Sequence, residues 1–232
     1  MKQSFEEQLI GEIVTRDFRA ASVFKEVGID FCCGGKMTLE AACKEKGISD
    51  QEITAKLDAL ESQTIDLAHN YNAWELGFLC DYIQNTHHKY VLKTLPELEF
   101  YTQKIASVHG SGHPELIEIA ELFSAINKEL HQHLKNEEEV LFPAIKEVEK
   151  GHSPKANAII VSEINRMTGE HEFAGGAMDK INVLAQNYKV PEDGCNSYRV
   201  AYKLLKEFED DLHFHVHLEN NILYPKALKK TL

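Results

Sequence analysis

The segment His133–Pro143 reads HLKNEEEVLFP, and the segment His215–Pro225 reads HVHLENNILYP. Both follow the pattern H-x-x-x-E-x-x-x-L-(F/Y)-P, and the second copy begins 215 − 133 = 82 residues after the first. Residues four apart lie on one face of an α-helix, about one turn from each other. Each copy therefore predicts a helix that points an imidazole and a carboxylate in the same direction.

Two further histidines extend this repeat. His88 and His171 are 83 residues apart, and they precede the two His-x-x-x-Glu pairs by 45 and 44 residues. This near-identical spacing selects His88 over its neighbour His87. It predicts two related helical hairpins, each supplying one histidine and then a His-x-x-x-Glu pair.

The segments around the repeat are long and sparsely interrupted by glycine and proline. We expect four long helices, with Pro96 as a point where the first can bend, at residues 72–108, 114–151, 154–188 and 197–228. Apolar residues recur in steps of three and four, and no useful stretch alternates with period two. The sequence therefore predicts an all-α protein whose main domain is an up-down four-helix bundle.

In three of these helices a polar residue interrupts the apolar stripe. A buried polar side chain without a partner costs on the order of several kcal/mol, so the interruptions need a common partner. A metal pair in the bundle centre meets this need, with each glutamate bridging two ions and each ion taking two histidines. Nitrogen and oxygen ligands with open positions favour iron over zinc or manganese. The predicted metal ligands are His88, His133, Glu137, His171, His215 and Glu219.

Two alternatives apply to these motifs. A single His-x-x-x-Glu on a helix is usually a solvated ion pair, and only the two matched copies favour metal. The stretch His213-Phe-His215-Val-His217 could instead form a strand with three histidines on one face. We expect His131, His213 and His217 to be exposed or to support the ligands from behind. The other histidines are expected to be surface residues, namely His69, His87, His109, His113 and His152.

Several acidic residues could support the ligands. Glu129 precedes His133 by one helical turn, and Glu138 and Glu170 adjoin predicted ligands. Metal-bound imidazoles usually donate their other N–H to a carboxylate or carbonyl. We expect Glu129 to serve in this role or in proton movement, while Glu138 could equally be a solvated carboxylate.

The N-terminal part differs from the bundle. Short helices are expected at 11–26, at 38–46 and from Ser49, where Glu52 completes a capping box. The sequence predicts a small helical domain over residues 1–62 and the bundle over 66–232, with a short linker near 63–70.

A loop of the small domain carries Cys32-Cys33-Gly34-Gly35. Adjacent cysteines close a strained ring when oxidised, so an internal disulfide is not expected. Cys32 and Cys33 are either small loop residues or a thiol site that passes electrons, accepts sulfur or touches metal. Cys43, Cys80 and Cys195 are expected to be isolated structural cysteines.

Composition excludes several function classes. The 232 residues hold 25 basic and 37 acidic side chains, and the net charge of −12 disfavours nucleic acid and anionic membranes as partners. No apolar run approaches the length of a membrane helix, and the N-terminal segment lacks the apolar core of a secretory signal. Five cysteines in such a chain indicate reduced thiols and a cytoplasmic protein.

Taken together, the loop 30–36 (DFCCGGK), the two H-x-x-x-E-x-x-x-L-(F/Y)-P blocks and Glu170-His171 resemble the Repair of Iron Centres family over essentially the whole chain. The resemblance implies a small N-terminal helical domain and a hemerythrin-like bundle that holds two non-haem iron ions with an oxo or hydroxo bridge. It places the iron ligands at the six residues that the repeat selects, and the thiol pair at Cys32 and Cys33. Oxygen-carrying hemerythrins have one more histidine ligand, so simple oxygen carriage is not implied.

The resemblance also implies a function. The expected role is repair of iron–sulfur clusters damaged by nitric oxide or oxidants, through supply of iron to damaged iron–sulfur proteins in the cytoplasm. Two alternatives share the same ligand set: a nitric oxide reductase or scavenger, and a module that senses or carries dioxygen or nitric oxide. The sequence leaves open whether the protein is an enzyme, and whether it is a monomer or a homodimer.

Overall fold

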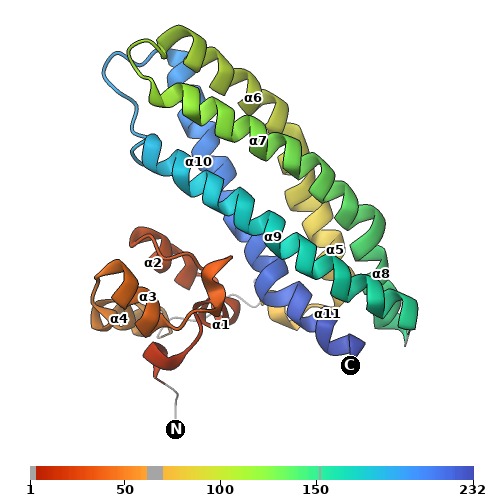
Figure 1. Ribbon diagram of the computed structural model, residues 1–232. Coiled ribbons are helices and arrows are strands. Elements are labelled where there is room, and N and C mark those ends of the chain that lie inside the picture. Colours follow the sequence, from red (N-terminus) through yellow and green to blue (C-terminus); the bar gives the residue numbers. More distant parts are fainter. Residues whose placement is uncertain (1–3, 62–69, 152) are drawn as a thin grey trace.

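The computed structural model describes residues 4–61, 70–151 and 153–232, and these residues form helices and no strand. The predicted all-α class is therefore confirmed. The four long rods of the bundle follow one another in sequence, and three of them contain a π-helical turn between two α-helices (Figure 1). The rods are α5 (Leu76–Ile83), η5 (Gln84–His88) and α6 (Lys89–His109); α7 (Glu115–Asn136), η6 (Glu137–Leu141) and α8 (Phe142–Lys150); α9 (Pro154–Leu184); and α10 (Asn196–His217), η7 (Leu218–Leu223) and α11 (Tyr224–Thr231).

The rods pack in an up-down arrangement. Helix α6 contacts α7 and α10, and α9 contacts the same two helices on the other side. Ser153 caps α9 by accepting a hydrogen bond from the Ala156 N–H, as Ser-Pro at a helix start predicts. Helix α6 continues through Pro96, and the same rod contains the π turn η5 further upstream.

The small N-terminal part lies beside α9 and α10 (Figure 1). Its elements are η1 (Phe5–Glu7), α1 (Ile10–Arg16), α2 (Ala20–Glu26), η2 (Gly34–Lys36), α3 (Leu39–Lys46) and α4 (Asp50–Glu61). The single helix expected over 11–26 is wrong, because Asp17 accepts hydrogen bonds from the backbone and side chain of Arg19 and starts a new helix. The predicted domain boundaries at 62 and 66 fall outside the described residues and stay predictions.

Two apolar clusters build the core of the bundle. One contains Leu134, Ala174 and Val216 and continues into the small N-terminal part, and the other contains Leu141 and Met167. Each of the four rods passes from one cluster to the other, and its predicted metal ligands lie at or next to that crossing. The ligand side chains therefore form a polar layer between two apolar ones.

Candidate metal centre

The structure brings all six predicted ligands together in the polar layer, and all six are buried. The Nε2 atoms of His88 and His133 both lie 3.3 Å from Glu137 Oε2. On the other half of the repeat, the Nε2 atoms of His171 and His215 lie 3.2 and 3.0 Å from the carboxylate of Glu219. The helical interpretation of residues 213–217 is thereby confirmed, and the alternative of a strand is excluded.

The six side chains divide into two overlapping sets of four. One set is His88, Glu137, His215 and Glu219, and the other replaces its histidines with His133 and His171. Within each set the ligand atoms lie within 4.8 Å of one another. Each set takes one histidine from each hairpin, and both sets contain Glu137 and Glu219.

Hydrogen bonding within the layer leaves several atoms that a cation would satisfy. His133 Nε2 and His171 Nε2 face each other at 3.1 Å. Only one of two facing ring nitrogens can donate a proton to the other, so this pair makes at most one hydrogen bond. His88 Nε2, Glu137 Oε2 and Glu219 Oε2 are buried without a well-aligned hydrogen bond among the described residues. Buried polar atoms of this kind call for a partner. Cations at the centre of the layer fit the donors that the chain presents.

Without a cation, the layer balances its charge with protons. Burial lowers the pKa of His88 and His133, but hydrogen bonds and charges of the buried carboxylates outweigh it and raise both to about 10. Burial and the charge of Glu219 raise the pKa of Glu137, but the two imidazoles next to it outweigh them and lower it to about 2. His215 differs, because burial leaves its pKa below the usual value. Protons therefore occupy ligand nitrogens that a cation needs.

The three π turns are a feature that sequence reasoning missed. His88 ends η5, Glu137 begins η6, and Glu219 lies in η7. A π turn inserts one residue into a helix, changes the direction of its side chains, and occurs often at functional sites. The repeat held a signal, because Pro143 and Pro225 lack the N–H that an α-helical turn would donate to the preceding turn.

Three of the four imidazoles are oriented by a second partner. His88 Nδ1 lies 2.9 Å from Glu138, His133 Nδ1 lies 2.7 Å from Glu170, and His171 Nδ1 lies 3.0 Å from Asn220. Nε2 of each ring is thereby directed to the centre, as metal-binding imidazoles require. The support comes from residues that adjoin the ligands and not from Glu129, whose carboxylate has no hydrogen bond to these rings among the described residues.

The fourth imidazole is held by stacking. His215 Nδ1 has no hydrogen-bond partner among the described residues. His87 lies parallel to the ring of His215, with ring centroids 5.6 Å apart, and His87 Nδ1 pairs with Asp211 at 2.8 Å. The expectation that His87 is exposed is therefore wrong.

The aromatic residue of each repeat block covers a ligand on the partner helix of the same hairpin. Phe142 stacks on His88, and Tyr224 lies parallel to His171. The Tyr224 hydroxyl also donates a hydrogen bond of 2.5 Å to Glu137 Oε1. The shared spacing of the two blocks therefore serves packing on the imidazoles, and the tyrosine adds an anchor for the Glu137 carboxylate.

The cysteine loop folds around a carboxylate. Asp30 accepts hydrogen bonds from the backbone N–H groups of Cys32, Cys33 and Gly34, and from the thiol of Cys32 at 3.1 Å. Cys32 is buried, and its hydrogen bond with Cys33 together with burial raises the pKa of its thiol well above the usual value. Cys33 is half-buried, and its sulfur faces Gly175 of α9. The structure places both thiols outside the polar layer of the bundle.

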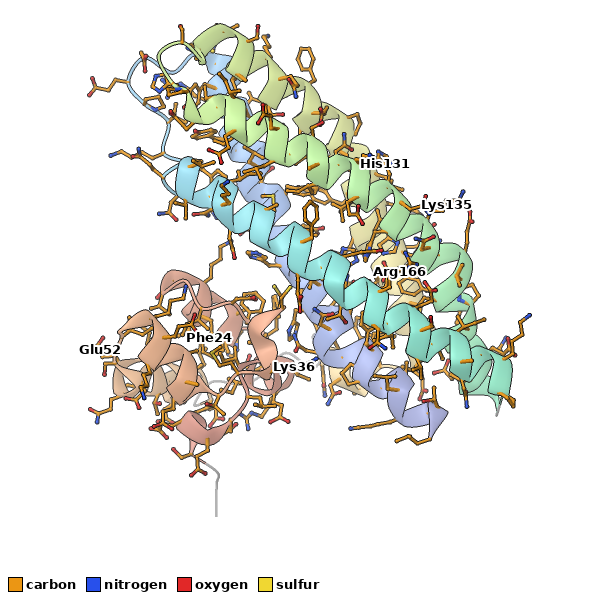
Figure 2. All side chains as sticks on the ribbon, viewed as in Figure 1. Phe24, Lys36, Glu52, His131, Lys135 and Arg166 are labelled. Carbon is orange, nitrogen blue, oxygen red and sulfur yellow. The ribbon has the colours of Figure 1, made fainter. Side chains whose placement is uncertain are left out.

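The other histidines and cysteines are distributed unevenly. His217 is buried and pairs with Asn221, whereas His131 is exposed on α7 (Figure 2). His109 lies 3.2 Å from the exposed Cys195, which corrects the expectation of a structural cysteine there. The hydrogen bond from His109 lowers the pKa of Cys195 to about 7. His69 and His152 lie outside the described residues.

Comparison with known families agrees with this geometry. Residues 81–227 match the hemerythrin HHE cation binding domain, and residues 6–61 match a domain of unknown function (DUF542). The bundle and its buried histidine–glutamate layer therefore define a hemerythrin-like cation-binding protein. None of the helices in the described ranges is long and apolar enough to span a membrane.

Curated relatives extend over both parts. The iron-sulfur cluster repair protein YtfE of Pectobacterium carotovorum is 35% identical over 97% of this chain and 99% of its own length. The protein of the same name from Yersinia pestis is 34% identical over 97% of this chain and 98% of its own length. The chain belongs to the family of these proteins, the Repair of Iron Centres family.

Proposed function

We propose that this chain holds two iron ions in the polar layer and repairs iron–sulfur clusters damaged by nitric oxide or oxidants. The observation that carries the proposal is the pair of four-residue sets that share Glu137 and Glu219. The names of the relatives support cluster repair as the function. We expect the clients to be damaged iron–sulfur proteins of the cytoplasm.

The residues of the layer have separate tasks in this proposal. Glu137 and Glu219 would each bind both ions, and each ion would be held by two of the four histidines. Tyr224 fixes one oxygen of Glu137, while the two apolar clusters exclude water from both sides. Bound iron supplies the metal that a damaged cluster has lost and a centre that can change its oxidation state.

The two sets of ligands are not equally supported. His133 and His171 both have a hydrogen-bond partner at Nδ1, whereas in the other set only His88 does. Loss of such a partner typically costs 10- to 100-fold in metal affinity, so an order-of-magnitude difference between the sets is expected. We assign the more easily released ion to the set that contains His215.

Metal analysis and Mössbauer spectra of protein purified without oxygen test the ligand set. Two irons per chain are expected, with loss of iron in Glu137→Ala and Glu219→Ala. Glu139→Ala is the matched control, because Glu139 is an exposed carboxylate in the same π turn as Glu137. Full iron content in either ligand variant would show that the bridging assignment is wrong.

A repair assay tests the function. A [4Fe–4S] dehydratase inactivated by nitric oxide should regain activity with the iron-loaded chain and not with Glu219→Ala. Formation of nitrous oxide from nitric oxide without any recovery of the dehydratase would instead identify a nitric oxide reductase.

The thiol role is proposed for Cys33 more than for Cys32, since the Cys32 thiol is buried and already donates to Asp30. Cys33→Ala should retain both irons and lose much of the repair activity. Cys32→Ala should retain both the irons and the repair activity. Equal loss in the two variants would contradict this assignment.

A further inference from the structure

A cavity of about 470 Å³ lies between the small N-terminal part and the bundle. One wall is the loop that contains Asp30 and Cys32, and the other is formed by α9 and α10. Figure 1 shows the N-terminal helices beside these two helices of the bundle. The cavity is separate from the polar layer, because none of the six predicted ligands contributes to its walls.

Three metal-binding side chains meet at the bundle wall of this cavity. The ligand atoms of Asp179, Glu209 and His213 lie within 4.8 Å of one another. His213 precedes His215 by two residues on the same helix, so the two imidazoles point to different sides of α10. The group therefore faces the cavity while His215 faces the interior of the bundle.

Glu209 is a buried carboxylate that the metal centre does not use. Its exposed fraction is 2%, and burial raises its pKa. The Asn182 amide donates to both of its oxygens, at 3.0 and 3.1 Å, which fixes the plane of the carboxylate. A carboxylate held in this way is oriented for a further partner.

The charges already present do not satisfy the group. Lys25 Nζ is 3.8 Å from Glu209, but its direct partner is Asp210 on the outer side of α10. The ring of His213 contacts the edge of Phe31, and neither of its nitrogens has a hydrogen bond among the described residues. Two carboxylates and an imidazole thus converge on a space that Lys25 borders without filling.

We propose that this cavity binds one divalent transition-metal ion through Asp179, Glu209 and His213. One nitrogen and two oxygen donors suit ferrous iron, manganese or zinc, and the open volume beyond them leaves positions for water or an exchanging ligand. The site is independent of the proposed function, and it places a second metal position where the N-terminal part meets the bundle.

Cobalt(II) titration of the iron-loaded protein tests the site. One additional equivalent of Co²⁺ is expected, with visible absorption bands, and an anomalous signal at the cobalt edge in crystals should locate it beside His213. No additional equivalent, or cobalt found only elsewhere, would overturn the proposal.

Variants separate this site from the buried centre. His213→Ala and Glu209→Gln should weaken cobalt binding by roughly tenfold or more, and neither should change the iron content. His131→Ala is the control for loss of a histidine, because His131 is exposed on α7. Unchanged cobalt affinity in His213→Ala would reject the assignment.

Lys25→Met gives a test that does not depend on removing a ligand. This change takes away the positive charge nearest to Glu209, so cobalt should bind several-fold more tightly. Equal or weaker binding in a folded Lys25→Met protein would show that Glu209 only serves an ion pair. Failure of the proposed function would instead appear as missing iron in the polar layer, with the cobalt equivalent retained.

Discussion

Tyr224 and Phe142 occupy the same position in the two halves of the repeat, yet only the tyrosine donates a hydrogen bond to a glutamate of the polar layer. Phe142 has no hydroxyl group, so Glu219 receives no corresponding hydrogen bond. The Glu219 Oε2 atom is buried without a well-aligned partner among the described residues. The hydroxyl group of Tyr224 therefore breaks the pseudo-symmetry of the site, as does the missing Nδ1 partner of His215.

Tyr224→Phe should lower the stability of the metal-free protein. The lost hydrogen bond ends on a charged, buried oxygen, so the expected cost is about 1.5–3 kcal/mol. Tyr198→Phe is the matched control, since its hydroxyl pairs only with the neutral Tyr202 and should cost less. Urea unfolding of both variants measures the difference, and equal costs would contradict the role of Tyr224.

Proton balance in the polar layer gives a pH prediction. His88 and His133 have a pKa of about 10 in the metal-free fold, so near neutral pH cations displace roughly two protons from these rings. Apparent metal affinity should rise with pH up to that value. Calorimetric titration in buffers of different ionisation enthalpy counts the protons, and binding without proton release would contradict the prediction.

The same groups set the stability of the metal-free protein. The two raised histidine pKa values contribute stability that is complete below the usual value of 6.5 and is lost as the pH rises through about 10. Glu137 contributes stability above its usual value of 4.5, and this is lost as the pH falls towards 2. Burial lowers the pKa of His213 to about 4 and of His217 to about 3, so their contribution to stability is complete above the usual value of 6.5 and is lost as the pH falls. The metal-free bundle should thus be most stable near pH 6.5, as thermal unfolding over a pH series can check.

At the scale of the helix, the spacing of the repeat was sufficient to predict the rods and all six converging side chains. The apolar spacing alone did not reveal the π turns, and the signal for two of them lay in Pro143 and Pro225, which lack the N–H of an α-helical turn. Nor could the spacing choose Glu138 and Glu170 over Glu129, since that choice depends on how neighbouring helices face each other.

Pro143→Ala tests the cause of the π turn in η6. Alanine restores an N–H that can close an α-helical turn, so Glu137 should turn away from the centre and metal affinity should fall by roughly tenfold. Helix content should stay the same. Pro96→Ala is the control, because Pro96 lies inside α6 away from the π turn of that rod. Unchanged metal affinity in Pro143→Ala would show that packing, and not the proline, causes the π turn.

At the scale of the whole molecule, Asn221 makes one of the contacts that join the small N-terminal part to the bundle. The Asn221 amide donates to the carbonyl oxygens of Phe31 and Cys32, at 3.1 and 3.3 Å. A Cβ atom on Gly35 would come within 2.5 Å of the Asn221 side-chain oxygen. The loop can approach the bundle this closely only because Gly35 has no side chain.

Gly35→Val should therefore weaken the docking of the N-terminal part on the bundle without unfolding either part. Faster hydrogen exchange is expected in α1, which contacts both η2 and η7. Gly176→Val is the control, because a Cβ there meets nothing within 4 Å. Unaltered exchange in α1 of Gly35→Val would show that the contact does not hold the parts together.

Asn221 follows the predicted ligand Glu219 by two positions within the same π turn. The same π turn thus contributes one residue to cation binding and another to docking of the N-terminal part. Two equilibria that bias the same element are reciprocal: any factor by which a cation tightens the docking is the factor by which docking tightens the cation. Partners that pull the N-terminal part away would then release metal, and the strength of that release can be read from docking measurements alone.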